Sequence, residues 1–119
     1  AIWRRELEVV QEAIHMSLEA IKSQEIVKAA HIDNVAREVV RKAGYRTWPD
    51  EMRTVWTGHP VGGFSSPAIT SESQDEIEDG MIFTIEPGIY EKGKGGVRIE
   101  HHILAKKYDY EVLDRFPEL

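Results

Sequence analysis

Residues 80–104 read GMIFTIEPGIYEKGKGGVRIEHHIL, and this stretch decides the fold of the chain. In each half, side chains of two kinds alternate, which is the period of a β-strand. The halves predict one strand over residues 81–86, closed by the Pro-Gly pair at 87–88, and a second strand over residues 97–104. The Lys- and Gly-rich residues 92–96 predict a hairpin connection between them.

Each predicted strand carries one carboxylate in apolar company, Glu86 in the first and Glu100 in the second. Such a group is costly to bury unless a partner compensates its charge. One such partner is a metal ion held by both carboxylates and a histidine nitrogen, since this ligand set suits Mn, Co, Fe or Zn. The alternative is a structural salt bridge between Arg98 and one of the two carboxylates.

Two amphipathic helices are predicted ahead of the strands. Residues 3–22 place apolar side chains at steps of three and four, which indicates a helix with one buried stripe. The stripe comprises Leu7, Val10, Ile14, Leu18 and Ile21. A second helix is predicted over residues 32–43, with Asp33 or Asn34 near its N-cap and Gly44 as the residue that ends it.

A histidine lies in a glycine-rich loop between the helices and the hairpin. A short strand is predicted over residues 54–57, followed by the loop Gly-His-Pro-Val-Gly-Gly at residues 58–63. Glycine on both sides of His59 allows the backbone to approach another group closely, which favours a functional site. The alternative is an ordinary turn with a surface histidine.

The remaining segments complete an α+β fold. The acidic residues 72–79 predict a solvated turn, and the alternation over residues 108–113 predicts a last strand beside residues 103–104. Residues 116–119 are expected to pack over the sheet as a tail. We therefore expect one domain over residues 1–119, with two helices on one face of a curved, mostly antiparallel sheet.

The composition argues against several classes of function. The 119 residues include 15 Lys and Arg against 21 Asp and Glu, a net charge of −6, and the basic residues are scattered, so no nucleic acid partner is expected. The absence of cysteine excludes disulfides and a thiol nucleophile. Apolar runs are too short for a membrane span and no signal-peptide pattern is present, so we expect no membrane partner and a cytoplasmic location.

In combination, these segments resemble a known family. Gly58-His59, followed by GMIFTIEPGIY at residues 80–90 and GVRIE at residues 96–100, is similar to the C-terminal signature of the creatinase/prolidase/methionine aminopeptidase family. Xaa-Pro dipeptidases (prolidases) and Xaa-Pro aminopeptidases are the members it resembles most, and the likeness extends to both predicted helices. The resemblance implies the C-terminal half of a pita-bread fold.

The resemblance also implies a two-metal site and a reaction. Family members hold two divalent ions, such as Mn, Co or Zn, with two Asp, one His and two Glu; His59, Glu86 and Glu100 match the last three ligands. The metals activate a water molecule that attacks a peptide bond next to proline, and Glu86 matches the carboxylate that takes up its proton. Peptides containing proline are therefore the implied substrates.

Several positions depart from the family pattern. The two Asp ligands are implied upstream of the first helix and have no counterpart here, since Asp33 and Asp50 lie in other elements. Val55 stands where active members have a histidine, and Ser65 or Ser66 stands near the place of a second one. A hydroxyl donates a hydrogen bond but carries no positive charge near neutral pH, so stabilisation of the transition state would be weaker.

Three interpretations are compatible with these residues. The chain is a fragment or degenerate member of an Xaa-Pro metallopeptidase with an incomplete metal site, a non-catalytic module that binds peptides or proteins on the same fold, or a structural half-domain. If this half stands alone, the sheet face that meets the other half in the family is exposed. We therefore expect a homo-oligomer or a partner half-domain.

Overall fold

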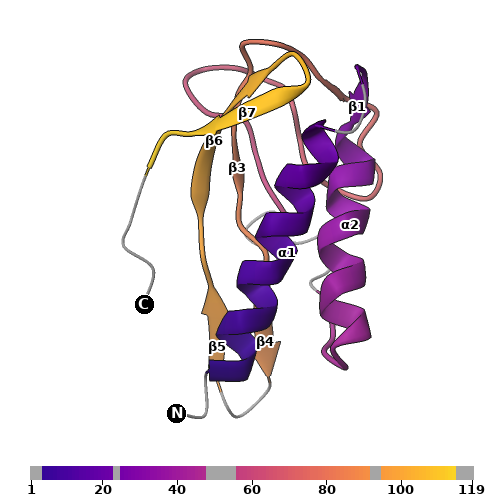
Figure 1. The fold of residues 1–119 in the computed structure, drawn as a ribbon, viewed down its shortest axis with the longest axis vertical. Helices are drawn as coiled ribbons and strands as arrows, with labels where there is room; N and C mark the ends of the chain where they lie inside the picture. Colours follow the sequence, from indigo (N-terminus) through magenta and orange to yellow (C-terminus); the bar gives the residue numbers. More distant parts are fainter. Residues whose placement is uncertain (1–3, 23–24, 48–55, 92–94, 115–119) are drawn as a thin grey trace.

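A computed structural model describes residues 4–22, 25–47, 56–91 and 95–114 of the chain. Two helices lie side by side against a long, bent β-hairpin (Figure 1). The elements in chain order are α1 (Arg4–Lys22), β1 (Val27–Lys28), α2 (Ala29–Lys42), β2 (Glu76–Ile77), β3 (Ile82–Ile85), β4 (Gly88–Glu91), β5 (Gly95–Arg98), β6 (His101–Lys106) and β7 (Asp109–Val112). All pairs of these strands are antiparallel, and the expected α+β class is confirmed.

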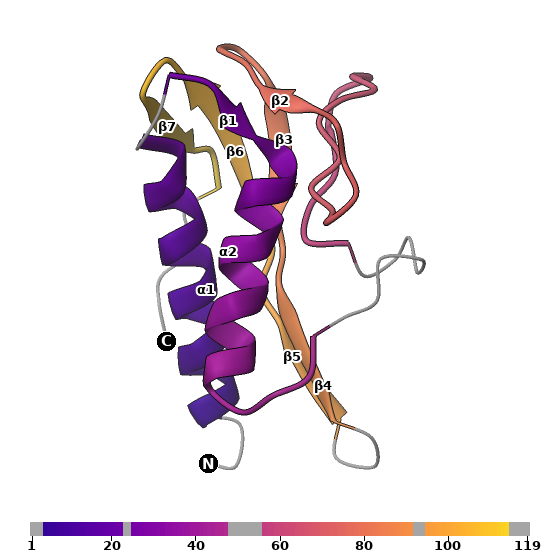
Figure 2. The same ribbon diagram turned by 90° about the vertical axis from the view of Figure 1, so that its right-hand side faces the viewer.

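Both predicted helices form, and their apolar sides face the hairpin. α1 agrees with the prediction over residues 3–22 as far as the structure describes it, and α2 runs beside it in the opposite direction (Figure 2). Gly44 follows α2 with a φ of +91°, where glycine carries no steric penalty, and ends the helix as predicted. Neither of these two helices has both the length and the apolar character that a membrane span requires.

The start of α2 differs from the sequence prediction. Its first residue is Ala29, ahead of the predicted start, because β1 pairs with β2 and Ala29 N donates a hydrogen bond to the carbonyl of Asp75. Lys28 is the N-cap and makes no side-chain cap, so the prediction of Asp33 or Asn34 near the N-cap is wrong. Asp33 lies instead inside the helix and is fully buried.

The hairpin keeps one register along its length although its ladder is interrupted. β3 pairs with β6, with Ile85 opposite His101, and β4 pairs with β5, with Gly88 opposite Arg98. These two pairings belong to the same register, so the residues between them face each other across the interruption. The hairpin therefore bends at this point without slipping.

The interruption corrects two details of the predicted strands. The second strand, predicted as one piece over residues 97–104, is divided into β5 and β6. The first strand ends at Ile85, ahead of Pro87 as predicted, but a further strand that was not predicted, β4, begins at Gly88. Proline has no N–H to donate, which accounts for the break on that side.

The two faces of the hairpin differ in composition. Successive side chains point to opposite faces of a strand. The face that packs against the helices is buried and apolar, with Phe83, Ile85, Ile89, Ile103 and Ala105. The opposite face, which we call the open face, consists of Ile82, Thr84, Glu86, Glu100, His102 and Leu104. The polar and ionisable side chains of these strands therefore lie mainly on the open face.

Further strand pairs lie at the end of the hairpin that is uppermost in Figure 1. β7 lies beside β6, which confirms the last strand predicted over residues 108–113. β2 falls within the acidic residues 72–79, so the solvated turn predicted there is wrong in part: Ile77 is buried and pairs with Val27 of β1.

Part of one predicted strand and the whole of the predicted tail lie outside the part of the chain that the structure describes. Of residues 54–57, the structure describes Trp56 and Thr57, and neither lies in a strand. Residues 54–55 and the tail at residues 116–119 lie outside the described residues.

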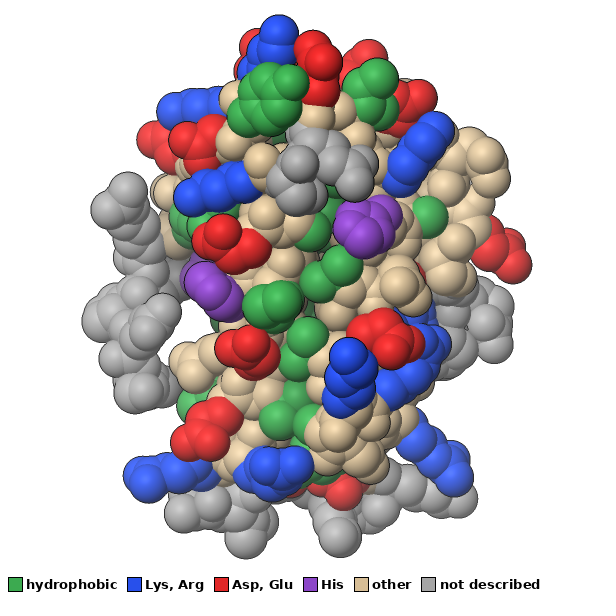
Figure 3. All heavy atoms as spheres, turned by 45° about the vertical axis from the view of Figure 1, so that its right-hand side comes forward, with side chains coloured by type: hydrophobic (Ala, Val, Ile, Leu, Met, Phe, Trp, Pro, Cys, Tyr) green, Lys and Arg blue, Asp and Glu red, His purple; other side chains and the backbone are tan. Residues whose placement is uncertain are grey.

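The surface carries charges of both signs. On the face shown in Figure 3, acidic and basic side chains are interspersed around a column of hydrophobic ones. The net charge of the chain is −6.

Candidate metal centre

Glu86 and Glu100 lie opposite each other on the open face. The register shared by the β3–β6 and β4–β5 pairs places the two glutamates directly across the interruption in the ladder. Cβ atoms in such a pair are about 4.5–5.5 Å apart, and like charges there destabilise the sheet. Glu86 is 7% exposed, so little water screens its charge. A cation close to the pair therefore stabilises it, and the Arg98 guanidinium already contacts Glu86 Oε1.

The segment that carries His59 runs along the other edge of β3. The N–H of Thr84 donates to the carbonyl of His59 at 2.9 Å, and the N–H of Val61 donates to the carbonyl of Ile82 at 3.0 Å. The N–H of His59 donates in turn to the Thr84 side-chain oxygen at 3.0 Å. His59 thus lies opposite Thr84, which makes His59 a diagonal neighbour of Glu86. Long side chains in diagonal positions can reach each other.

Gly58 makes this close approach possible. A Cβ atom at Gly58 would lie 1.9 Å from the carbonyl oxygen of Thr84 and 2.9 Å from a side-chain carbon of Ile69. Any other residue would push the segment away from β3. The prediction that glycine beside His59 serves a close backbone approach agrees with this geometry.

His59 faces both carboxylates through Nε2. This atom lies 3.2 Å from Glu86 Oε2 and 4.0 Å from Glu100 Oε2. Its other nitrogen, Nδ1, lies 3.0 Å from the carbonyl oxygen of Pro60. Because a carbonyl only accepts, this contact places a proton on Nδ1, and Nε2 is the nitrogen that would be available to a metal ion. This is the contact that commonly orients a metal-binding histidine.

The two oxygens of Glu86 have different surroundings. Arg98 donates from its guanidinium to Oε1, and its Nε donates to the Glu86 carbonyl at 3.2 Å. Oε2 is buried and accepts no hydrogen bond from the described residues, and His59 Nε2 lies 3.2 Å from it. The salt bridge with Arg98 and a cation at Oε2 therefore do not exclude each other.

These donor atoms fit a divalent metal ion. One ligand atom each from His59, Glu86 and Glu100 lies within 4.8 Å of the others. An ion between them would satisfy the orphaned Oε2, occupy the lone pair of His59 and remove the repulsion between the glutamates. Carboxylate oxygens with one imidazole nitrogen suit Mn, Co or Zn.

A histidine–aspartate pair borders this cluster on β6. His102 Nδ1 lies 2.9 Å from Asp114 Oδ2, and the backbone N–H of His102 donates to Asp114 Oδ1 at 2.8 Å. The side-chain hydrogen bond raises the pKa of His102. Burial alone would raise the pKa of Asp114, but the hydrogen bonds from His102 outweigh it and hold this pKa below its ordinary value. The pair fixes the orientation of His102 two residues from Glu100.

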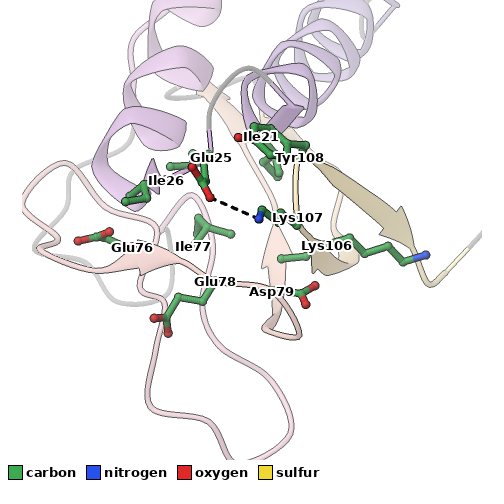
Figure 4. A pocket seen from close by; sticks show the side chains of 12 residues that line it. Ile21, Glu25, Ile26, Glu76, Ile77, Glu78, Asp79, Lys106, Lys107 and Tyr108 are labelled. Carbon is green, nitrogen blue, oxygen red and sulfur yellow. Dashed lines mark ion pairs between the residues drawn. The ribbon is translucent and has the colours of Figure 1, made fainter.

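A cavity of about 290 Å³ lies elsewhere, at the end of the molecule where β1, β2 and the β6–β7 turn meet (Figure 4). Glu25 and Lys107 form an ion pair of 3.4 Å across its wall, and Ile26 and Ile77 contribute apolar surface. Its lining includes neither His59 nor either glutamate of the cluster. The candidate metal centre is therefore separate from this cavity.

The structure places the sequence-predicted site residues in two groups. His59, Glu86 and Glu100 come together on the open face, while Asp33 is buried within α2. Ser65 is exposed and Ser66 half-buried in the loop after His59. Val55 and Asp50 lie outside the described residues. The role of the three clustered residues as ligands stays a prediction.

Sequence reasoning missed the side-chain contact between Asp33 and Thr57. The sequence did contain a signal for this network. Arg37 follows Asp33 by one helical turn, on the side of α2 that is otherwise buried and apolar. An oppositely charged pair at that spacing on a buried face indicates an internal network.

Curated relatives of this chain are peptidases. An uncharacterized peptidase of Staphylococcus epidermidis is 38% identical over 102 residues, which cover 82% of this chain and 28% of the relative. An uncharacterized peptidase of Staphylococcus aureus is 36% identical over 111 residues, covering 91% of this chain and 30% of that protein. The chain therefore spans less than a third of the length of these relatives.

Solved structures share the fold. The X-Pro aminopeptidase of Thermotoga maritima superposes with a TM-score of 0.81 at 32% identity, over 96% of this chain and 31% of that one. The prolidase of Pyrococcus furiosus superposes with a TM-score of 0.83 at 31% identity, over 99% of this chain and 34% of that one. The two helices and the bent hairpin are those of the C-terminal half of a pita-bread domain.

A family-level comparison agrees with both findings. Residues 3–107 match metallopeptidase family M24, which is most of the chain. This match includes α1, α2, the segment of His59 and the whole bent hairpin. The chain belongs to metallopeptidase family M24.

Proposed function

We propose that this chain supplies the His and the two Glu ligands of a metallopeptidase site that hydrolyses peptides next to proline, as Xaa-Pro dipeptidases and aminopeptidases do. The observation that carries the proposal is the convergence of His59 Nε2, Glu86 Oε2 and Glu100 Oε2 on the open face. The similar structures of an X-Pro aminopeptidase and a prolidase support the substrate class. Two Asp ligands would come from residues outside the sequence given.

A divalent ion, Mn, Co or Zn, would be held by these three side chains. When bound, such an ion polarises the scissile carbonyl and makes water a stronger nucleophile near neutral pH. The protein's contribution is to hold the donor atoms in place before the ion arrives. Pro60 fixes the ring of His59 through Nδ1, and Arg98 fixes the carboxylate of Glu86 through Oε1.

Glu86 is proposed to carry the proton in this reaction. Arg98 holds Oε1, which leaves Oε2 facing the open side of the hairpin beside His59. In the proposed reaction the Glu86 carboxylate takes up the proton of the attacking water and delivers it to the leaving amine. Glu100 is exposed and faces no described cation other than a protonated His59, so its proposed role is confined to metal binding.

A second candidate is binding of peptides or proteins without hydrolysis. The observation that favours it is the loop after His59, where Ser65 and Ser66 stand near the place of the family's second histidine. A serine hydroxyl retains a hydrogen-bond donor but not a cation. Peptide affinity without turnover in the metal-loaded protein would support this candidate.

The open face is proposed to be covered in the assembled protein, by an upstream half-domain or by a second copy of the chain. Glu86 and Glu100 lie on this face together with Ile82 and Leu104, which are half-buried. Sedimentation at rising concentration tests the second arrangement. A monomer throughout would leave the upstream half-domain as the proposed cover.

Calorimetric titration with Mn²⁺, Co²⁺ and Zn²⁺ tests the metal site. We expect binding by the chain that is lost in Glu86→Gln and Glu100→Gln but retained in Glu111→Gln, an exposed carboxylate paired with Lys106 at 3.4 Å. An Ala-Pro hydrolysis assay alongside tests turnover. Binding that is indifferent to the first two substitutions would refute the proposed ligands.

A further inference from the structure

A charged pair lies buried in α2, away from the metal cluster. Asp33 is fully buried, and the side chain of Arg37 is only 7% exposed. Neither belongs to the group of side chains that could hold a metal. Burying a charged pair is costly, and replacement by apolar residues is often neutral or stabilising, so its presence calls for a role beyond stability.

Asp33 connects two parts of the fold. Arg37 Nε donates to Asp33 Oδ2 at 2.8 Å within the helix. The hydroxyl of Thr57, itself fully buried, donates to Asp33 Oδ1 at 2.5 Å. Through this second bond α2 holds a residue that lies 24 positions further along the chain.

Thr57 in turn lies next to two of the proposed ligands. Its carbonyl accepts the N–H of Glu86 at 2.7 Å, and His59 follows it by two residues. Gly58, between Thr57 and His59, packs so closely on β3 that an added Cβ atom would meet the carbonyl oxygen of Thr84. Asp33 therefore fixes Thr57, and the position of Thr57 determines where Glu86 and His59 lie.

We infer that Asp33 is a positioning residue for the metal site, acting through Thr57 on Glu86 and His59. This inference rests on the proposed function for its metal, but the geometry it invokes belongs to the protein alone. Partners that orient metal ligands typically account for about 10–100-fold in metal affinity. If the ion pair were merely structural, its loss would lower the free energy of unfolding. It would disturb the metal ligands no more than the loss of any other core contact.

Substitutions at Thr57 separate the two roles. Thr57→Val removes the hydroxyl and keeps the shape and the backbone carbonyl, while Thr57→Ser keeps the donor. Thr70→Val is the matched control, because Thr70 is buried at 8% exposure and lies outside the Asp33 network. Asp33→Asn, which retains one acceptor, serves as a second variant if Thr57→Val does not fold. Folding of each is checked by circular dichroism.

Two readouts are needed, Mn²⁺ affinity by calorimetry and amide hydrogen exchange by NMR. We expect Thr57→Val to weaken Mn²⁺ binding by about tenfold or more and to speed exchange at the Glu86 and Thr84 amides. The Ala105 amide, which donates to Met81 at the far end of β3, should exchange at the parent rate. Thr57→Ser and Thr70→Val should keep the parent affinity.

The outcomes distinguish this inference from the proposed function. Unchanged affinity and unchanged Glu86 exchange in Thr57→Val would overturn the positioning role, as would an equal loss of affinity in Thr70→Val. If the parent chain binds no Mn²⁺, the proposed function fails, and exchange alone decides the positioning role. Faster exchange confined to Glu86 and Thr84 would then support it, and parent-like exchange would refute it.

Discussion

The two faces of the bent hairpin use the same strands for opposite purposes. The helix-facing side is a closed apolar surface in which Phe83, Ile85 and Ile103 are fully buried. The open face gathers like charges, with Glu86 and Glu100 opposite each other and His59 beside them. One face stabilises the fold, whereas the other stores electrostatic repulsion that a bound cation would relieve. Changes on the two faces should therefore differ in sign as well as in size.

The largest expected effect is on the helix-facing side. Phe83→Ala should lower the free energy of unfolding by about 3–5 kcal/mol, because it removes a fully buried ring from the core between the helices and the hairpin. Urea denaturation followed by circular dichroism measures it. Leu104→Ala, a half-buried position on the open face, should cost less. Equal costs would contradict the distinction between the faces.

Metal addition should act through the open face alone. Mn²⁺ at about one hundred times its dissociation constant should raise the free energy of unfolding by about 2.7 kcal/mol, because the ion binds the folded chain. Leu104→Ala should gain as much as the parent chain. Glu86→Gln should gain nothing, and a gain equal to the parent's would place the ion elsewhere.

Without metal, Glu100→Gln should be slightly more stable than the parent. The substitution removes one of two like charges that lie opposite each other, a repulsion of about 0.2–1 kcal/mol. Denaturation in the presence of EDTA measures this gain. Glu111→Gln, which breaks an exposed ion pair, is the control and should give no gain. A loss of stability in Glu100→Gln would show that the site contains no net repulsion.

The smallest effect concerns Asp114 at the border of the open face. Its lowered pKa means that its charged form stabilises the fold above the ordinary value of 3.8, and that this contribution is lost as the pH falls through the folded-state pKa. Asp114→Asn should therefore cost under about 1 kcal/mol at neutral pH, and the difference from the parent should shrink below pH 3.8. Asp79→Asn, an exposed carboxylate before β3, is the control. A difference that persists in acid would exclude an electrostatic cause.

The helices and strands could be predicted because their signals are local. The stripe of α1 and the alternation around Phe83 report burial on one side of an element, and burial decides both structures. Pairings between distant short segments give no such signal. β1 and β2 contain two residues each, so the sequence predicted a turn where Ile77 is buried.

The site was predictable in its residue types but not in its connections. Glu86 and Glu100 stand out as carboxylates in apolar strands, and glycine marks the loop of His59. Asp33 was misread as a cap, because the local preference of Asp for helix starts competes with a contact to Thr57 that only the tertiary fold creates. Arg98 donates to Oε1 of Glu86 and not to Oε2, and this choice likewise depends on the tertiary geometry.

The central claim is that His59 meets a metal ion through Nε2 while Nδ1 keeps its proton on the Pro60 carbonyl. Nitrogen-15 NMR of the histidine rings during titration with diamagnetic Zn²⁺ tests it directly, because the chain has five histidines that serve as internal controls for one another. We predict that the His59 Nε2 resonance shifts on binding, that its Nδ1–H is retained, and that Glu100→Gln abolishes the shift. A His59 ring that does not respond while other histidines do would contradict the account.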